Sequence, residues 1–316
     1  MIAIPIENVD NIIVHFSESI NDQKNNILIK LNNYANNLDG SKENYVRLLI
    51  DFFENSNGLI AKKDVLIQKR IEFDNICRSN DFEAKDWKKF KDKLLNLLGY
   101  SIRRGDFFPE YFHKIGIKSC VFCNSQLCVT VNSKRNKLIA KFQVDHFLNK
   151  NDYPCFSVSL FNLYPVCGSC NLKKRNHEID FDLYVNSKDI LGSNYKFQIK
   201  DIDASVGKFL LDRNINNIKI EFIEPVVPVL YKQLNDVFSI EGIYDTQKDI
   251  VEELILKAEV YKQSYKKTLI ESFPEIFNSG NITNRLIVGN YCDENEIHKR
   301  PMAKFQQDIA KQLGLI

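Results

Sequence analysis

The chain has 316 residues, of which 44% are hydrophobic and 27% are charged, and its formal net charge is +2. This composition is typical of a globular protein with a buried core and excludes a polycation, so a nucleic-acid surface would have to come from local clustering. No apolar run is long enough to cross a bilayer and the first residues are too polar for a secretory signal, so we expect a cytoplasmic protein without a membrane partner.

The first third of the chain predicts helices after a short extended start. Residues 1–17 contain two apolar runs, which we interpret as one or two short strands. From about residue 18 to residue 100, apolar residues recur at steps of three and four, which is the period of amphipathic helices. A linker is expected over residues 101–118, which contain Gly105, Pro109 and Gly116.

Two Cys-x-x-Cys pairs follow, Cys120 with Cys123 and Cys167 with Cys170. This spacing lets two thiolates from one tight turn bind a single ion, and two such turns complete a closed tetrahedral site of the structural zinc type. Residues that can start a helix follow the second pair, so the arrangement resembles a treble clef. We expect the other cysteines to be small buried hydrophobic residues; they are Cys77, Cys128, Cys155 and Cys292.

The 43 residues between the two pairs contain polar residues at defined places. Residues 138–144 alternate like a strand, so Asp145 and His146 are expected at its end. Neighbouring side chains on an extended chain point to opposite sides, so one can hold a metal while the other faces a water or substrate. A second strand is expected around residues 156–160.

Positive charge gathers around these motifs. Between His113 and Glu178 the sequence has ten Lys or Arg residues and three acidic residues, a local excess of about +7. Such an excess is the footprint expected for phosphate contact. The best candidates are Lys150, Lys173, Lys174 and Arg175, with a solvated helix face as the alternative for each.

In the last part of the chain, residues 196–202 and 217–225 alternate like strands. A single amphipathic helix is expected over about residues 246–273, and a short helix after Pro301. We therefore expect three consecutive domains: residues 1–104, mainly helical; residues 105–185, holding the cysteine pairs; and residues 186–316, an α+β region that binds a partner or substrate.

The order Cys-x-x-Cys, Asp-His, Asn-Leu, Cys-x-x-Cys-Asn resembles the HNH endonucleases of the ββα-metal class in their four-cysteine form. The run VDHFLNKNDYPCFSVSLFNLYPVCGSCNLKK is similar to HNH effectors of bacterial antiphage systems of the Septu and retron-associated type. The motifs cover about residues 119–178. The resemblance implies a metal-dependent nuclease that cuts phosphodiester bonds in nucleic acid, mainly DNA, alongside an ATPase partner protein.

The resemblance also implies roles for single residues. His146 takes the place of the general base, and Asp145 takes that of a ligand of the catalytic metal. Asn162 matches the residue that steadies the loop carrying the base. Asn171 matches the second metal ligand, with His177 as an alternative. Two oxygen ligands suit Mg²⁺ or Mn²⁺, an ion distinct from the zinc.

The sequence thus predicts an α+β protein in which a mainly helical frame surrounds a ββα-metal, treble-clef-like HNH centre. The alternative is a non-catalytic zinc module that recruits nucleic acid or a protein partner. Both candidate functions predict the zinc site, and only the first predicts cleavage.

Overall fold

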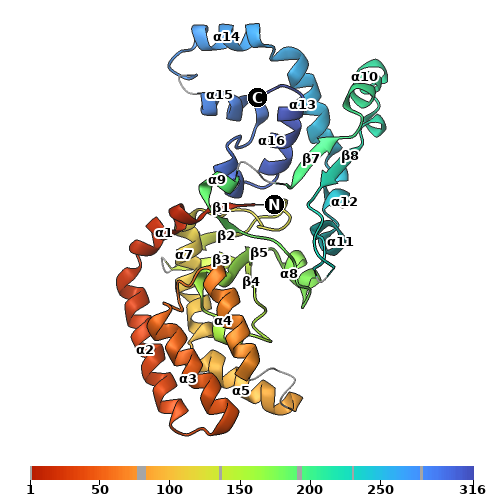
Figure 1. Cartoon of the computed structure of the whole chain (residues 1–316). Helices are drawn as coiled ribbons and strands as arrows, with labels where there is room; N and C mark the ends of the chain where they lie inside the picture. Colours follow the sequence, from red (N-terminus) through yellow and green to blue (C-terminus); the bar gives the residue numbers. More distant parts are fainter. Residues whose placement is uncertain (1, 77–82, 135–136, 191–193, 230, 278–279) are drawn as a thin grey trace. The chain divides into compact units, whose positions relative to one another are not determined.

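The computed structural model describes residues 2–76, 83–134, 137–190, 194–229, 231–277 and 280–316 (Figure 1). The chain divides into two compact units, each built from segments that are separate in the sequence. Unit 1 comprises Met1–Glu7, Gly116–Val129 and Val166–Ile316. Unit 2 comprises Asn8–Ile115 and Thr130–Pro165.

The described residues form helices and four two-stranded sheets, which confirms the α+β class. The division into three consecutive domains is a different partition of the chain and stays a prediction. Within the described part of the chain, no helix combines the length and the apolar character that crossing a bilayer requires.

Unit 2 contains the helical frame, and the helices expected over residues 18–100 are confirmed. Buried residues of these helices recur at helical spacing, as in α3, where Val46, Leu49, Ile50 and Phe53 face the core. The helices are α1 Ile6–Val14, α2 Ser17–Ala35, α3 Gly40–Asn55, α4 Lys63–Ile76, α5 Ala84–Leu97, α6 Tyr100–Gly105 and α7 Phe107–Ile115.

Two small sheets complete unit 2. One pairs β2 (Val129–Asn132) with β3 (Leu138–Lys141), and the other pairs β4 (Gln143–His146) with β5 (Leu163–Val166). Between β4 and β5 lie a loop and two 3₁₀ turns, η2 (Pro154–Phe156) and η3 (Leu160–Asn162). The strand expected over residues 138–144 is therefore present, divided at Phe142 into β3 and β4.

The helical frame holds the segment between β4 and β5 at several points. Trp87 Nε1 on α5 donates to Asn151 O over 3.0 Å, and Arg70 Nε on α4 donates to the Tyr153 hydroxyl over 2.9 Å. The buried ring of Phe156 lies 5.4 Å from that of Phe52 and packs edge-on against it. The core of the frame and the segment after β4 are thus one packed body.

Unit 1 holds the remaining elements. Its strands are β1 (Ile4–Pro5), which pairs in parallel with β6 (Tyr184–Val185), and β7 (Lys196–Ile199), which pairs antiparallel with β8 (Ile220–Ile223). Its helices are α8 Gly168–Lys174, α9 Ser187–Ile190, α10 Ile202–Asp212, η4 Ile215–Asn217, α11 Leu234–Phe238, α12 Ile240–Asp245, α13 Lys248–Val260, α14 Gln263–Ser272, α15 Gly280–Val288, η5 Glu294–Lys299 and α16 Ala303–Gln312. The strands in residues 196–202 and 217–225 and the helix after Pro301 are confirmed.

Helix α16 closes the free edge of β7 with side chains. Asp308 Oδ2 accepts from the Phe197 backbone N–H over 2.9 Å, and the Gln312 amide pairs with both the N–H and the C=O of Ile199, over 2.7 and 3.0 Å. A side-chain amide has one donor and one acceptor side, so Gln312 substitutes for a strand neighbour. The C-terminal helix is thereby bound to the sheet of unit 1.

Of the two apolar runs at the start of the chain, the first contains a short strand as predicted, and the second was wrongly interpreted as extended. Only Ile4–Pro5 is a strand, and α1 begins at Ile6. Val9 and Ile13 are its buried residues, four positions apart, which is helical rather than strand spacing. The apolar run was too short for its period to be read from the sequence.

The linker expected over residues 101–118 was also wrong, because α6 and α7 occupy most of it. Pro109 is the third residue of α7, where a backbone N–H has no partner within the helix in any case. Gly105 is the last residue of α6, and Gly116 follows α7 with φ +83°. The three residues that suggested a linker are therefore helix boundaries.

Two further expectations are corrected. Residues 246–273 form no single helix: α13 ends before Tyr261, whose ψ of 52° lies outside the helical range, and α14 starts at Gln263. The strand expected around residues 156–160 is absent, because the described backbone there connects two 3₁₀ turns and β5 begins only at Leu163.

A candidate zinc centre and an Asp-His site

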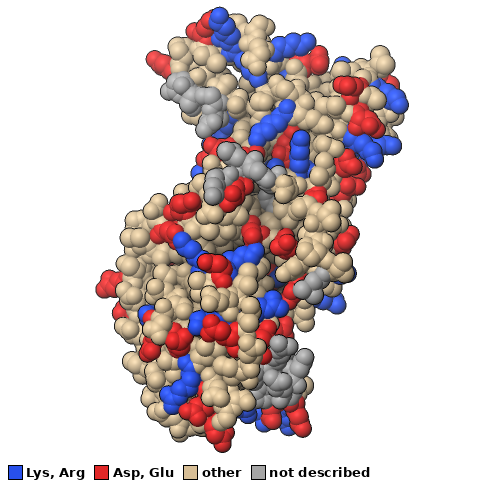
Figure 2. All heavy atoms as spheres, in the orientation of Figure 1, with Lys and Arg blue, Asp and Glu red and all other residues tan. Residues whose placement is uncertain are grey.

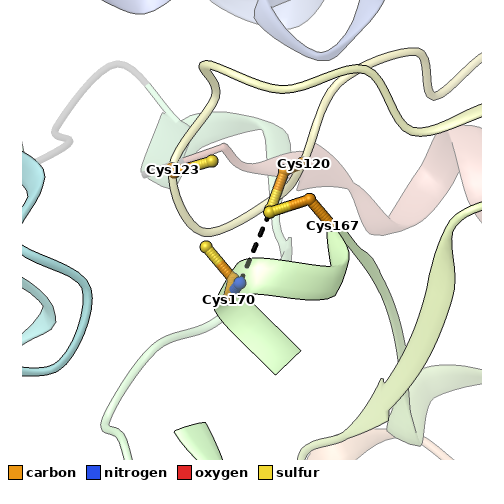
Figure 3. A group of neighbouring side chains, drawn as sticks. All are labelled: Cys120, Cys123, Cys167 and Cys170. Carbon is orange, nitrogen blue, oxygen red and sulfur yellow. Dashed lines mark hydrogen bonds between the residues drawn. The ribbon is translucent and has the colours of Figure 1, made fainter. Parts of the chain in front are cut away.

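The two cysteine pairs come together in unit 1. One Sγ from each of Cys120, Cys123, Cys167 and Cys170 lies within 4.8 Å of the others, and all four residues are buried. Figure 3 shows the four side chains turned toward one another, with Cys120 and Cys123 on a loop and the second pair at the start of α8. Zn–S bonds of 2.3 Å in a tetrahedron place sulfurs about 3.8 Å apart, so the cluster fits one zinc ion after a small contraction.

The second pair is formed by the start of a helix. Cys167 caps α8, where its Sγ accepts from the Cys170 backbone N–H over 3.4 Å, drawn as the dashed line in Figure 3. The expectation that a helix follows the second pair is thus confirmed. A thiolate at this position also lies against the positive end of the helix, which favours its charged form.

The first pair lies on a turn whose sharpest residue is Asn124, with φ at +52°. Asn tolerates this left-handed backbone better than most residues. The turn closes when the Asn124 N–H donates to Cys120 O over 2.8 Å, and the Ser125 hydroxyl donates to Cys123 Sγ over 3.2 Å. Both sulfurs are thereby directed toward the second pair.

Asn124 is also fully buried and anchors this turn to the end of the chain. Its Nδ2 donates to Ser119 Oγ over 2.9 Å, and its Oδ1 accepts from the Lys304 N–H over 3.0 Å. The Tyr244 hydroxyl donates to Cys123 O over 2.7 Å. The turn is therefore supported by α12 and α16, which come much later in the sequence, and the sequence carried no signal for this.

The thiols of the cluster influence one another strongly. Burial raises the pKa of Cys120, and hydrogen bonds with Cys120 raise the pKa of Cys167 and Cys170. Hydrogen bonds from the other three sulfurs lower the pKa of Cys123. A bound cation would supply the positive charge that allows these buried sulfurs to ionise.

The other described cysteines lie outside the cluster. Cys128 and Cys155 are fully buried, as expected for small hydrophobic residues, and Cys292 is half-buried. Burial raises the pKa of Cys292 to about 11. Cys77 lies outside the residues that the structure describes.

In unit 2, Asp145 and His146 are the last two residues of β4. They are 9% and 3% exposed. The His146 ring lies 5.6 Å from that of Tyr100, and its Nε2 is 3.2 Å from Ser157 O. Because a carbonyl oxygen only accepts, Nε2 carries the proton in the neutral ring and the lone pair is on Nδ1.

Asn162 closes the loop that follows His146. Its backbone C=O accepts from the Phe147 N–H over 2.9 Å, and its Oδ1 accepts from the Leu148 N–H over 2.7 Å. Its Nδ2 donates to Leu148 O over 3.2 Å and to Phe156 O over 2.9 Å. One fully buried side chain thus joins both ends of the loop beside β4.

Basic and aromatic residues surround this dipeptide. Lys150 Nζ lies 3.3 Å from the Tyr100 hydroxyl and 4.6 Å from the centre of its ring. Burial lowers the pKa of Lys150, Arg104 lowers it further, and Asp145 opposes both effects. Tyr100 and Arg104, both on α6, were not predicted as site residues, because Tyr100 was placed at the end of a predicted helical region and Arg104 in a predicted linker.

The other predicted residues lie on or after α8 in unit 1. Asn171 is half-buried, and its backbone N–H donates to Cys167 O over 3.0 Å. Lys173, Arg175 and His177 are exposed, whereas Lys174 is only 6% exposed. On the face drawn in Figure 2, Lys and Arg side chains are interspersed with Asp and Glu.

No known protein family, curated protein or solved structure matches the chain. Its function is therefore inferred from the chemistry of the two sites. The four cysteines can hold one metal ion. The Asp-His dipeptide offers a carboxylate and an imidazole beside Lys150 and Arg104.

Proposed function

We propose that the protein is a metal-dependent HNH endonuclease that hydrolyses phosphodiester bonds in DNA. The observation that carries this proposal is the order of its parts. β4 ends in Asp145-His146, Asn162 closes the following loop, and β5 leads within one residue into α8 with the second cysteine pair. Two paired strands and a helix in this order resemble the ββα-metal arrangement.

In this proposal His146 is the general base that takes a proton from the attacking water. The hydrogen bond from Nε2 to Ser157 O fixes the tautomer, so Nδ1 is the basic nitrogen. The Tyr100 ring on one side of the imidazole restricts its rotation. A histidine suits this role because its ordinary pKa lies near neutral pH.

From the resemblance, we propose that Asp145 supplies a carboxylate ligand and Asn171 a carboxamide ligand to the catalytic ion. Both are hard oxygen ligands, which fit Mg²⁺ or Mn²⁺ and differ in kind from the four sulfurs of the zinc cluster. Bound there, such an ion would stabilise negative charge that develops on the phosphate and the leaving oxygen.

Positive side chains supply the contacts to the nucleic-acid backbone. Lys150 and Arg104 lie beside the dipeptide, and Lys173 and Arg175 project from the end of α8. In the proposal these four contact phosphates, whereas Lys174 is buried. Binding should therefore weaken as salt rises, because each phosphate contact releases counterions.

The biological setting is proposed from the resemblance alone. HNH proteins of the similar antiphage systems act as effectors beside an ATPase, so we propose the same setting for this chain. Coexpression with a candidate ATPase, followed by copurification, tests the partnership independently of cleavage. Two proteins that separate at micromolar concentration would argue against it.

The decisive experiment for the nuclease proposal compares plasmid cleavage by the wild type and His146→Ala in the presence of Mg²⁺ or Mn²⁺. We expect the wild type to cut and His146→Ala to be slower by about 10²-fold or more, since a positioned general base contributes about that much. His15→Ala, an exposed histidine outside the site, should cut normally.

The possible outcomes separate the two candidate functions. Cleavage that survives His146→Ala would remove His146 from its proposed role. A wild type that binds DNA and zinc but cuts neither DNA nor RNA with either ion would favour the non-catalytic zinc module.

A further inference from the structure

A cavity of about 690 Å³ opens in unit 2. Its walls come from α2, from the junction of α5 and α6, from α7 and from the start of β3. Neither Asp145 nor His146 lines it. Its volume lies within the range of natural small-molecule sites.

Arg103 is the feature that gives this cavity a chemical preference. The residue lines the cavity and is 8% exposed. Its Nε donates to Leu98 O over 3.1 Å and one terminal nitrogen donates to Gln23 Oε1, so both acceptors are neutral. Among the residues that the structure describes, no carboxylate oxygen lies within 4.0 Å of the guanidinium.

A buried charge of this kind is costly. Burial lowers the pKa of Arg103 to about 10, and no counterion opposes that shift. Buried charges in proteins are ordinarily paired, because neutral hydrogen-bond partners do not offset the lost hydration. The guanidinium has five N–H donors, and its hydrogen bonds to Leu98 O and Gln23 Oε1 leave donors for an anion in the cavity.

The other charged residues around the cavity do not cancel its preference for an anion. Lys30 and Lys137 are positive and Asp106 and Glu110 are negative, which with Arg103 gives the lining a net charge of about +1. Asp106 already pairs with Lys137 at the surface. The lining is therefore mildly positive, with its most buried charge on Arg103.

The rest of the lining is suited to an apolar body. Ile27, Leu98, Phe107 and Leu138 line the cavity together with the polar side chains of Gln23 and Asn26. We propose that the cavity binds a small organic anion, with its phosphate or carboxylate group on Arg103 and its apolar body against Ile27 and Phe107. Arginine suits either group because its fork matches two oxygens at once.

The test is calorimetric titration of the full-length protein with three probes. Adenosine 5′-monophosphate carries a phosphate, indole-3-acetate carries a carboxylate, and adenosine is the neutral control. We expect at least one anion to bind with a Kd below about 10 mM, and adenosine to bind at least tenfold more weakly. The anion that binds identifies which of the two groups the cavity prefers.

Variants locate the binding in the cavity. Arg103→Met should weaken it at least tenfold, whereas Arg47→Met, an exposed arginine on α3, should leave it unchanged. Asn26→Trp fills the cavity from an exposed position while Arg103 stays intact, and it should also abolish binding. If Arg103→Met fails to fold, Asn26→Trp decides the question.

Three results would overturn the proposal: neither anion binds, adenosine binds as tightly as the anions, or binding persists in Asn26→Trp. Because binding is measured without a nucleic-acid substrate, these results are independent of whether the chain is a nuclease.

Discussion

At the scale of single residues, Asn162 holds the loop that follows the Asp-His dipeptide. It makes three side-chain hydrogen bonds to the backbone at both ends of the loop after β4. We expect Asn162→Ala to lower the free energy of unfolding by about 2–4 kcal/mol, because buried backbone groups would lose their partners. Urea denaturation followed by circular dichroism measures this change.

Two control variants sharpen this prediction. Asn162→Asp keeps the acceptor for the Leu148 N–H but loses both donated bonds, so its stability should be reduced as well. Asn33→Ala removes an exposed asparagine from α2 and should change stability by less than about 0.5 kcal/mol. An Asn162→Ala protein as stable as the wild type would show that the loop is held by other contacts.

At the scale of elements, the turn that carries Cys120 and Cys123 depends on Asn124 in two ways. Asn124 adopts the left-handed backbone of the turn, and its side chain makes the buried hydrogen bonds that anchor it. Asn124→Gly keeps the left-handed backbone accessible and loses only the side-chain bonds. Asn124→Ala loses the bonds and also meets the left-handed penalty of about 1–2 kcal/mol. We therefore expect the Ala variant to be less stable than the Gly variant.

Melting curves and zinc content of both Asn124 variants test this order. A Gly variant that matches the wild type would mean that the buried bonds to Ser119 and Lys304 contribute little. An Ala variant that matches the Gly variant would mean that the turn relaxes out of its left-handed conformation.

Elements with strong local signals were predictable from the sequence. The spacing of the cysteines predicted their cluster, and the alternation before Asp145 predicted a strand ending at that residue. The strand at Leu163–Val166 was expected too early, around residues 156–160. The apolar segment there is continuous, so it has no period that distinguishes a strand from a turn. Helices α6 and α7 were missed because Gly105 and Pro109 stand at boundaries rather than in a linker.

The features that could not be predicted from the sequence depend on contacts between residues far apart in the chain. Asn124 is anchored by Lys304, 180 positions later, and Arg103 bonds with Gln23, 80 positions earlier. Tyr100 becomes part of the Asp-His site only through packing against His146. A local pattern cannot encode such contacts, because they exist only once the chain has folded.

At the scale of the whole molecule, the four-cysteine cluster and the Asp-His dipeptide belong to different units. Removing zinc should therefore act first on unit 1, whose turn, α8 and C-terminal helix meet around the sulfurs. We expect a strong chelator, or Cys170→Ser, to lower the melting temperature by about 10 °C, since structural zinc contributes several kcal/mol to folding. Differential scanning calorimetry with metal analysis measures both quantities.

Cys292→Ser provides the matched control for zinc removal. Cys292 is a half-buried cysteine outside the cluster, so this variant should keep one zinc per chain and melt close to the wild type. A folded wild type that contains no zinc, or a Cys170→Ser protein that retains it, would contradict the assignment of the four cysteines.

The central proposal is that the protein uses two metals with separate roles, a zinc that builds unit 1 and a hard cation that supports cleavage. One measurement tests it directly: the rate of plasmid cleavage by zinc-loaded protein as Mg²⁺ is added and then withdrawn with a mild chelator, with zinc content followed in the same samples. We expect cleavage that appears with Mg²⁺ and disappears without it, at a constant one zinc per chain, and no cleavage in His146→Ala. Cleavage that follows the zinc content, or that persists in His146→Ala, would contradict it.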